Sequence, residues 1–113
     1  MHEYSIVQSL IDSCEEHARK NNAKKVTKVV VKIGTLSGVE PHLLREAYEM
    51  FRLGTVCNDA ELVLNLQKVK VHCNVCGVEE ELEKNEFICP KCGSFDIKVL
   101  DGEEMYLMSL ELE

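Results

Sequence analysis

Between residues 5 and 23 the apolar residues recur every three or four positions, as they do on one face of an amphipathic helix. Polar and charged residues fill the other positions, and Asn21 and Asn22 are natural stop residues. The pattern therefore predicts a first helix that packs one face against a core. The residues of that face are Val7, Leu10, Ile11, Cys14 and Ala18.

The pattern then changes to alternation, which is typical of a strand with one buried face. From Val26 to Ile33, valine and isoleucine alternate with Lys28 and Lys32. A second helix is predicted after it, with Pro41 in its first turn and Gly54 closing it in a left-handed cap. Its buried stripe is Leu44, Ala47, Tyr48 and Phe51.

Two further strands are predicted, at 61–67 and at 102–113. The first would bury Leu62, Leu64 and Leu66, and the second would place Tyr106, Met108, Leu110 and Leu112 on one face. The apolar phase slips between them, at Val69 and Val71, which indicates a boundary. The expected fold class is α+β, with two helices packed on a small three-stranded sheet and a module inserted into it.

The boundary divides the chain into two expected domains. Residues 1–68 together with 102–113 would form an α/β domain, and residues 69–101 would form the inserted module. No internal repeat is present beyond a pair of cysteine turns in the module.

Charge and length exclude several classes of protein. The 113 residues carry 13 Lys and Arg against 20 Asp and Glu, a net charge of -7, which disfavours binding to a phosphate backbone. Apolar stretches are only a few residues long, well short of a membrane span of about 20. The opening Met-His-Glu-Tyr-Ser lacks the pattern of a secretory signal, so we expect a cytoplasmic protein that does not bind membranes.

Four of the six cysteines form two C-x2-C-G turns, Cys73 with Cys76 and Cys89 with Cys92. Each turn can direct two thiolates at one ion, and four thiolates form a closed tetrahedral site with no open position for a substrate. The spacing predicts a structural zinc site in a zinc-ribbon or rubredoxin-like module. Iron is the chemical rival, because sulfur-only ligation does not distinguish the two metals.

The N-terminus offers a different kind of site. The Met1 amine, the His2 amide nitrogen and the His2 imidazole can chelate one ion, and the Glu3 amide nitrogen could complete a plane. Planar nitrogen donors suit Ni(II) or Cu(II) rather than zinc or calcium. The predicted helix begins almost at once, so His2 and Glu3 would lie near the folded body.

The M-H-E opening, the amphipathic first helix, the strand ending in Ile33-Gly34 and the late pair of C-x2-C turns together resemble the HypA family of nickel-incorporation accessory proteins. The resemblance covers essentially the whole chain. It implies a metallochaperone without catalytic turnover, which binds Ni(II) transiently and Zn(II) structurally. Its implied client is nickel-iron hydrogenase, and in some organisms also urease.

The resemblance also implies site residues and partners. His2 would be the nickel-binding histidine, with Met1 and Glu3 contributing through the amine and the backbone. Glu40 stands where some members carry an acid near nickel, although a charge favoured by the dipole of the second helix is the plain alternative. Cys73, Cys76, Cys89 and Cys92 match the zinc ligands. The implied partners are a HypB-family GTPase, the hydrogenase large subunit or its maturation complex, and a urease accessory protein.

One rival function belongs to another class, a zinc-ribbon adaptor that binds nucleic acid or transcription machinery. Such ribbons usually carry basic and aromatic residues. Residues 70–100 contain four Lys and six acids, so charge disfavours this alternative.

Overall fold

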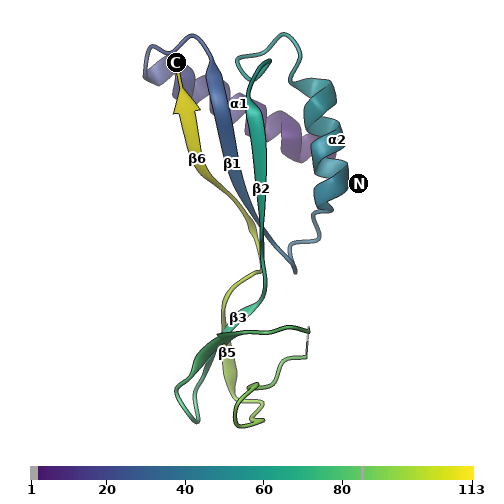
Figure 1. The fold of residues 1–113 in the computed structure, drawn as a ribbon, viewed down its shortest axis with the longest axis vertical. Helices are drawn as coiled ribbons and strands as arrows, with labels where there is room; N and C mark the ends of the chain where they lie inside the picture. Colours follow the sequence, from purple (N-terminus) through teal and green to yellow (C-terminus); the bar gives the residue numbers. More distant parts are fainter. Residues whose placement is uncertain (1–2, 85) are drawn as a thin grey trace.

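The computed structural model describes residues 3–84 and 86–113. Within these residues two helices and six strands alternate along an elongated molecule of 52 × 28 × 17 Å (Figure 1). The strands form two separate three-stranded sheets, and this confirms the α+β class with its inserted module. The elements are α1 Glu3–Lys20, β1 Val26–Gly34, α2 Pro41–Phe51, β2 Glu61–Gln67, β3 Lys70–Cys73, β4 Glu79–Glu81, β5 Ile97–Asp101 and β6 Met105–Leu112.

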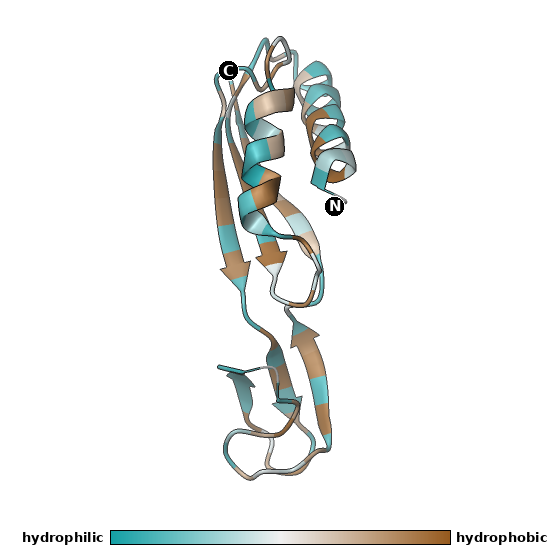
Figure 2. Ribbon diagram, turned by 90° about the vertical axis from the view of Figure 1, so that its right-hand side faces the viewer, coloured by the Kyte–Doolittle hydropathy of each residue, from teal (hydrophilic) through white to brown (hydrophobic). Residues whose placement is uncertain are grey.

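The larger sheet has the strand order β2-β1-β6, with β1 at its centre. β1 runs parallel to β2 and antiparallel to β6. Parallel neighbours need a crossover connection, and α2 with its flanking loops supplies it. Both helices cover the same face of this sheet, so the opposite face is left without a helix (Figure 2).

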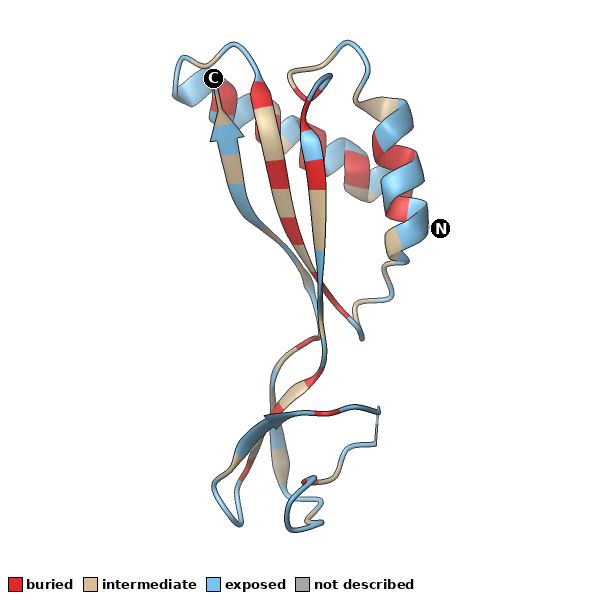
Figure 3. Cartoon of the chain, in the orientation of Figure 1, coloured by how far each residue is buried: buried red, intermediate tan, exposed pale blue. Residues whose placement is uncertain are grey.

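The main core lies between the helices and the covered face of the sheet (Figure 3). The predicted stripe of α1 is buried, and so are Val29, Val31 and Ile33, the apolar residues predicted for one face of β1. Along the described chain, no helix combines the length and apolar content that crossing a bilayer requires. The largest side chains that are fully buried in this core are Tyr48, Ile33, Leu44, Val7, Val26, Val29 and Val31.

The prediction for the last strand is wrong in its first half. Met105, Leu107, Leu110 and Leu112 pack against the core, whereas Met108 is 54% exposed. The reason is a register shift in the pairing with β1, where Val30 and Val31 face Ser109 and Leu107 and leave Met108 as an extra residue. A bulge of this kind reverses the alternation of side chains, so simple period-two counting fails across it.

Two smaller expectations also need correction. In β2, Leu62 is buried but Leu66 is 63% exposed, because the helices do not extend over that end of the sheet. α2 ends at Phe51 with Arg52 as its C-cap in a right-handed conformation. Gly54 does adopt the predicted left-handed conformation, but in the following turn, where its N–H donates to Asn58 Oδ1 at 2.9 Å.

The smaller sheet has the strand order β4-β3-β5 and a minimal core of its own. Val69, Val71 and Leu82 are its buried residues, with Ile97 and Val99 packed against them. The edge strand β4 consists of three exposed glutamates and has no apolar pattern. Such a small apolar cluster contributes little stability, so the module needs another source of folding free energy.

The two sheets are joined at a crossing of backbone segments next to the end of β1. Leu36 N–H donates to Gly102 O at 2.9 Å, and Thr35 N–H donates to Gln67 O at 2.9 Å. A Cβ atom on Gly34 would lie 2.3 Å from Gly102 O, so only glycine allows this approach. Gly102 itself has a φ of 101°, which favours glycine again. The loop after β1 therefore anchors both connections to the smaller sheet.

We predict that Gly34→Ala, at the last residue of β1, destabilises the crossing. The added methyl group would collide with the backbone at Gly102, so we expect a loss of about 2 to 4 kcal/mol in the free energy of unfolding. Chemical denaturation would measure it. Gly38→Ala is the control, because a Cβ there meets nothing within 4 Å and only its φ of 78° opposes the change. Equal losses in the two variants would contradict the steric explanation.

A second prediction concerns an ion pair beside the same crossing. Lys32 Nζ donates to Asp101 Oδ2 at 2.7 Å, and this contact with Lys32 and the Gly102 N–H lower the pKa of Asp101. Because the pKa of Asp101 is lower in the folded state, the ionised side chain stabilises that state at pH values above the ordinary Asp pKa of about 3.9. This contribution is lost as the pH falls through the lowered pKa of the folded state. Asp101→Asn should therefore cost about 1 kcal/mol at pH 7 and progressively less below about pH 4. Unfolding measured across this pH range tests it, and a pH-independent loss would refute it.

Candidate metal sites

Each cysteine pair lies on a tight turn that closes on a glycine. In the first turn, Gly77 N–H donates to Cys73 O at 2.9 Å, and in the second Gly93 N–H donates to Cys89 O at 2.9 Å. Both glycines have positive φ angles, of 78° and 76°. The two turns thus repeat one local structure, which the C-x2-C-G sequence specifies without help from distant residues.

The four sulfur atoms converge on one point. All lie within 4.8 Å of one another, with Cys73 Sγ 3.6 Å from Cys92 Sγ and Cys76 Sγ 3.7 Å from Cys89 Sγ. A zinc ion with four Zn–S bonds of about 2.3 Å requires sulfur atoms about 3.8 Å apart. The spacing found here fits a tetrahedral thiolate site.

Backbone amides of the turns point at two of the sulfur atoms. Cys76 N–H donates to Cys73 Sγ at 3.4 Å, and the N–H groups of Cys92 and Lys91 donate to Cys89 Sγ at the same distance. These donors stabilise a thiolate and so lower the pKa of Cys73, and they lower the pKa of Cys89 to about 6. Cys89 therefore favours the thiolate form at neutral pH, and the thiolate is the form that binds a metal.

The two turns are also joined by a pair of hydrogen bonds that does not involve cysteine. Asn74 N–H donates to Asp96 O, and Asn74 Nδ2 donates to Asp96 Oδ1, both at 3.0 Å. His72, next to Cys73, has its Nδ1 atom 3.2 Å from Glu79 Oε2 on the neighbouring strand. Among the described residues, the metal-ligating group consists of the four cysteines and does not include this histidine.

This arrangement can bind an ion but offers it no catalytic task. Four thiolates saturate a tetrahedral ion, so neither water nor a substrate could reach the metal without displacing a ligand. The binding would instead stabilise a module whose apolar core is very small. Zinc fits these donors well, and iron fits the same sulfur set.

The predicted nickel ligands lie at the other end of the molecule. Met1 and His2 fall outside the described residues, so their arrangement is not part of this structure. Glu3 is the first described residue, begins α1 and is only 4% exposed. Its Oε2 atom accepts a hydrogen bond from the Glu40 N–H at 3.1 Å, which brings together two residues that were predicted separately.

Glu40 is the N-cap residue of α2, yet its side chain makes no capping hydrogen bond. Its carboxylate is exposed, whereas its backbone N–H is engaged by Glu3. The contact attaches the beginning of α1 to the beginning of α2. Edge-to-face packing of Tyr4 on Phe51, with ring centroids 5.5 Å apart, adds a second contact between the two helices.

Sequence reasoning missed the contacts that support both sites. Nothing in the sequence pairs position 3 with position 40, because the two meet only when α1 and α2 pack on the same sheet face. The link between Asn74 and Asp96 had a weak signal, since Asn74 lies inside one cysteine turn, Asp96 follows the other, and both side chains hydrogen-bond readily.

Comparison with known proteins gives a consistent result. A family model described as "Hydrogenase/urease nickel incorporation, metallochaperone, hypA" matches residues 1–112. A hydrogenase maturation factor HypA from Aquifex aeolicus is 55% identical over 113 residues, covering 100% of this chain and 98% of that protein. One from Shewanella halifaxensis is 54% identical with the same coverage. The solution structure of the Ni metallochaperone HypA from Helicobacter pylori has a TM-score of 0.70 at 43% identity and covers 99% of this chain and 97% of that one.

Replacement of Cys89 by serine tests the metal site in the module. Cys89→Ser removes one of four ligands, so we expect zinc content to fall well below one ion per chain and NMR signals of residues 69–101 to lose their dispersion. Signals from α1 and β1 should persist, because their core lies in the other sheet.

Cys14→Ala is the matched control, since Cys14 is a fully buried cysteine of the main core. It should lower stability by about 1 kcal/mol and leave the zinc content unchanged. A Cys89→Ser protein that retained stoichiometric zinc would contradict the proposed ligand set.

Proposed function

Because the chain belongs to the HypA family, we propose that it is a nickel metallochaperone, which binds Ni(II) at its N-terminus and delivers it during the maturation of nickel enzymes. Nickel-iron hydrogenase is the proposed client, in keeping with relatives that are named hydrogenase maturation factors. Urease is a second client to consider, since the family description includes it.

The proposed nickel ligands are the Met1 amine, the amide and imidazole nitrogens of His2, and the amide nitrogen of Glu3. The contact from Glu3 Oε2 to the Glu40 N–H carries this proposal, because it fixes the residue next to His2 against the folded body. An ordered support removes much of the entropy cost of ordering a chain end around an ion.

Two further features of the same region support nickel binding. The Glu3 N–H hydrogen-bonds to the Glu3 carboxylate rather than within the helix, so coordination through the Glu3 amide would displace that contact and leave the hydrogen bonds of α1 intact. We propose that the Glu40 carboxylate is an additional donor beside the planar set of nitrogens. The Glu40 side chain is exposed, and the N–H of the same residue donates to Glu3 Oε2.

The two proposed metals would have separate tasks. Neighbouring ligands at an accessible chain end can be displaced one after another by a receiving site, which suits delivery. Four thiolates in a closed site exchange slowly, which suits a structural ion. We propose that residues 1–68 with 102–113 form the nickel-binding domain and residues 69–101 the zinc-binding module. The separate sheets and separate apolar clusters support this division.

We further propose a HypB-family GTPase and the hydrogenase large subunit or its maturation complex as partners, and a cytoplasmic location without catalytic turnover. The alternative of an adaptor for nucleic acid has no support from the comparisons. The strand β4 consists entirely of glutamate, and this counts against a phosphate-binding surface on that edge of the module.

Nickel titration of the untagged protein tests the proposed site. His2→Ala should abolish stoichiometric Ni(II) binding because it removes the imidazole that closes one chelate ring, and a few residues added before Met1 should do the same by removing the amine. Zinc content should remain unchanged in both. Because amide coordination requires loss of the amide protons, wild-type binding should also weaken steeply as pH falls.

The control is His42→Ala, which should leave nickel binding unchanged. His42 is an exposed histidine of α2, with its Nε2 atom 3.7 Å from Glu46 Oε2. Glu40→Ala should weaken binding without changing its stoichiometry, since the planar nitrogen set would remain. Full nickel affinity in both His2→Ala and the N-terminally extended protein would refute the proposal.

A further inference from the structure

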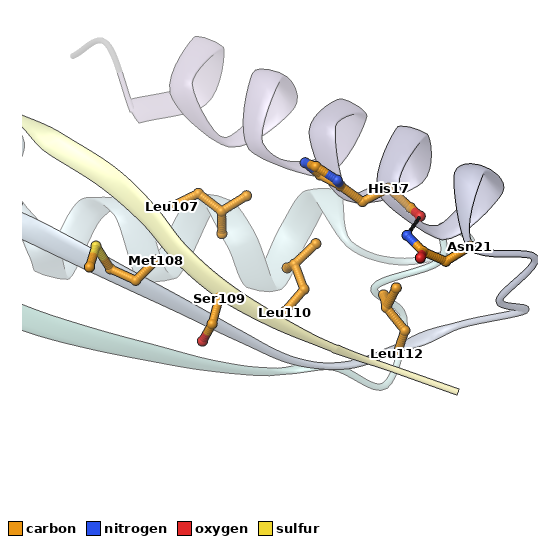
Figure 4. Close-up of a pocket in the computed structure, with 7 residues that line it drawn as sticks. All are labelled: His17, Asn21, Leu107, Met108, Ser109, Leu110 and Leu112. Carbon is orange, nitrogen blue, oxygen red and sulfur yellow. Dashed lines mark hydrogen bonds between the residues drawn. The ribbon is translucent and has the colours of Figure 1, made fainter.

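An uncharged groove runs between α1 and the edge strand β6. Two cavities of about 340 Å³ each form it, and they share Leu107 as a lining residue. Leu107, Leu110 and Leu112 point from β6 toward α1, whereas Ser109 points away (Figure 4). The helical wall of the groove consists mainly of Ser5, Ser9, Ser13, His17 and Asn21.

The absence of charge sets this groove apart from the rest of the surface. Among the described residues, none that lines either cavity is Asp, Glu, Lys or Arg, in a chain of which these make up 29%. Asp12 and Arg19 lie at other exposed positions of α1, Glu15 is half-buried and accepts a hydrogen bond from the Val56 N–H, and Glu16 pairs with Lys20. Small hydroxyl side chains at a spacing of four residues leave room above the apolar side chains of β6.

β6 also presents a free strand edge beside the groove, since within the described sheet it pairs with β1 alone. Gly34 N–H donates to Glu104 O, and Glu113 N–H donates to Lys25 O, which fixes the residues whose amides face β1. Alternation along β6, interrupted at Met108, then directs the backbone groups of Met105, Leu107, Leu110 and Leu112 away from β1. These are the same residues whose side chains pack on the helical side.

Charge at the two ends of β6 determines what can pair with it. Residues 103–113 contain four glutamates and no Lys or Arg. If two copies of the chain joined through this edge, in either direction, glutamates would face glutamates, and like charges opposite one another are destabilising. A segment with basic ends would instead meet Glu103 and Glu104 at one end. At the other end it would meet Glu111 and Glu113, which are exposed and also lie 3.9 and 3.7 Å from the Nζ atoms of Lys28 and Lys25.

We propose that this groove binds an extended segment of a partner protein, with an uncharged apolar centre and Lys or Arg at its ends, added as a fourth strand beside β6. Backbone hydrogen bonds to the free edge would provide affinity, and alternate side chains would enter the groove under α1. The bulge at Met108 interrupts the edge, which disfavours long flat strands and selects a short segment. Within the described part of the chain, its lining includes none of the four cysteines and no proposed nickel ligand.

A synthetic peptide with a short centre of alternating Val and Thr and paired Lys residues at both ends is the probe. Titrated into ¹⁵N-labelled full-length protein, it should shift the amide signals of Met105, Leu107, Leu110 and Leu112 and of the serines of α1. The same peptide with Glu ends should bind roughly tenfold more weakly or not at all. Equal binding of both peptides would overturn the charge argument.

Two matched pairs of variants locate the binding. Ser9→Arg places a bulky cation in the groove wall and should weaken peptide binding roughly tenfold, whereas Gln8→Arg adds the same charge on the side of α1 toward Phe51 and should not. Glu103→Lys should weaken binding several-fold, whereas Glu46→Lys at an exposed position of α2 should not. Zinc content and the far-ultraviolet spectrum, measured on each variant, establish that it is folded.

Two further outcomes would overturn the proposal in favour of another occupant. Two peptides can be made, each methylated at the alternate backbone nitrogens of one edge of the strand. If both bind as well as the unmodified peptide, backbone hydrogen bonds are not used and the groove recognises side chains alone, as it would if its occupant were a helix. If the protein instead self-associates with rising concentration and Ser9→Arg prevents this, the occupant is a second copy of the chain.

Discussion

The close approach of backbone segments at Gly34 and Gly102 determines how the two sheets can be joined. The chain leaves the larger sheet after β2 and returns to it at β6, so two connections must pass the end of β1. Without side chains at this point, the loop after β1 can hydrogen-bond to both connections. The larger sheet can therefore keep β1 paired on both sides although more than thirty residues intervene between its outer strands.

The two ends of the molecule solve the problem of small size in different ways. The larger sheet buries one face under two helices and draws its stability from apolar side chains. The smaller sheet has few such side chains and instead gathers four thiols, whose amide donors favour the charged form. A bound ion would then replace the core that the module lacks, which explains why a short insert can keep a defined shape.

Much of this architecture could be predicted from the sequence because local patterns specify it. Both helices, the central strand and the two cysteine turns depend on residues close together in the chain, such as Pro41 or the glycine that follows each pair. The remaining features depend on tertiary packing. Glu3 meets the Glu40 amide only because two helices share a face, and the acidic strand β4 exists through pairing with β3 rather than through any apolar pattern of its own. The exposure of Leu66 depends likewise on where the helices end, which alternation within one strand cannot reveal.

Met108 is an extra residue in β6. The side chains before it therefore lie on the opposite face from the one that uninterrupted alternation along the strand would give them. Tyr106, on the outer face of the first half, lies with its ring centroid 5.5 Å from Lys32 Nζ, and Lys32 in turn contacts Asp101. Loss of Met108 would remove the bulge and leave regular alternation, with Tyr106 still on the outer face opposite Lys32. An additional residue in the same half, with no second bulge to accommodate it, would instead turn Tyr106 toward the helical side. The bulge thus makes this strand tolerant of a one-residue deletion at position 108 and intolerant of a one-residue insertion beside it.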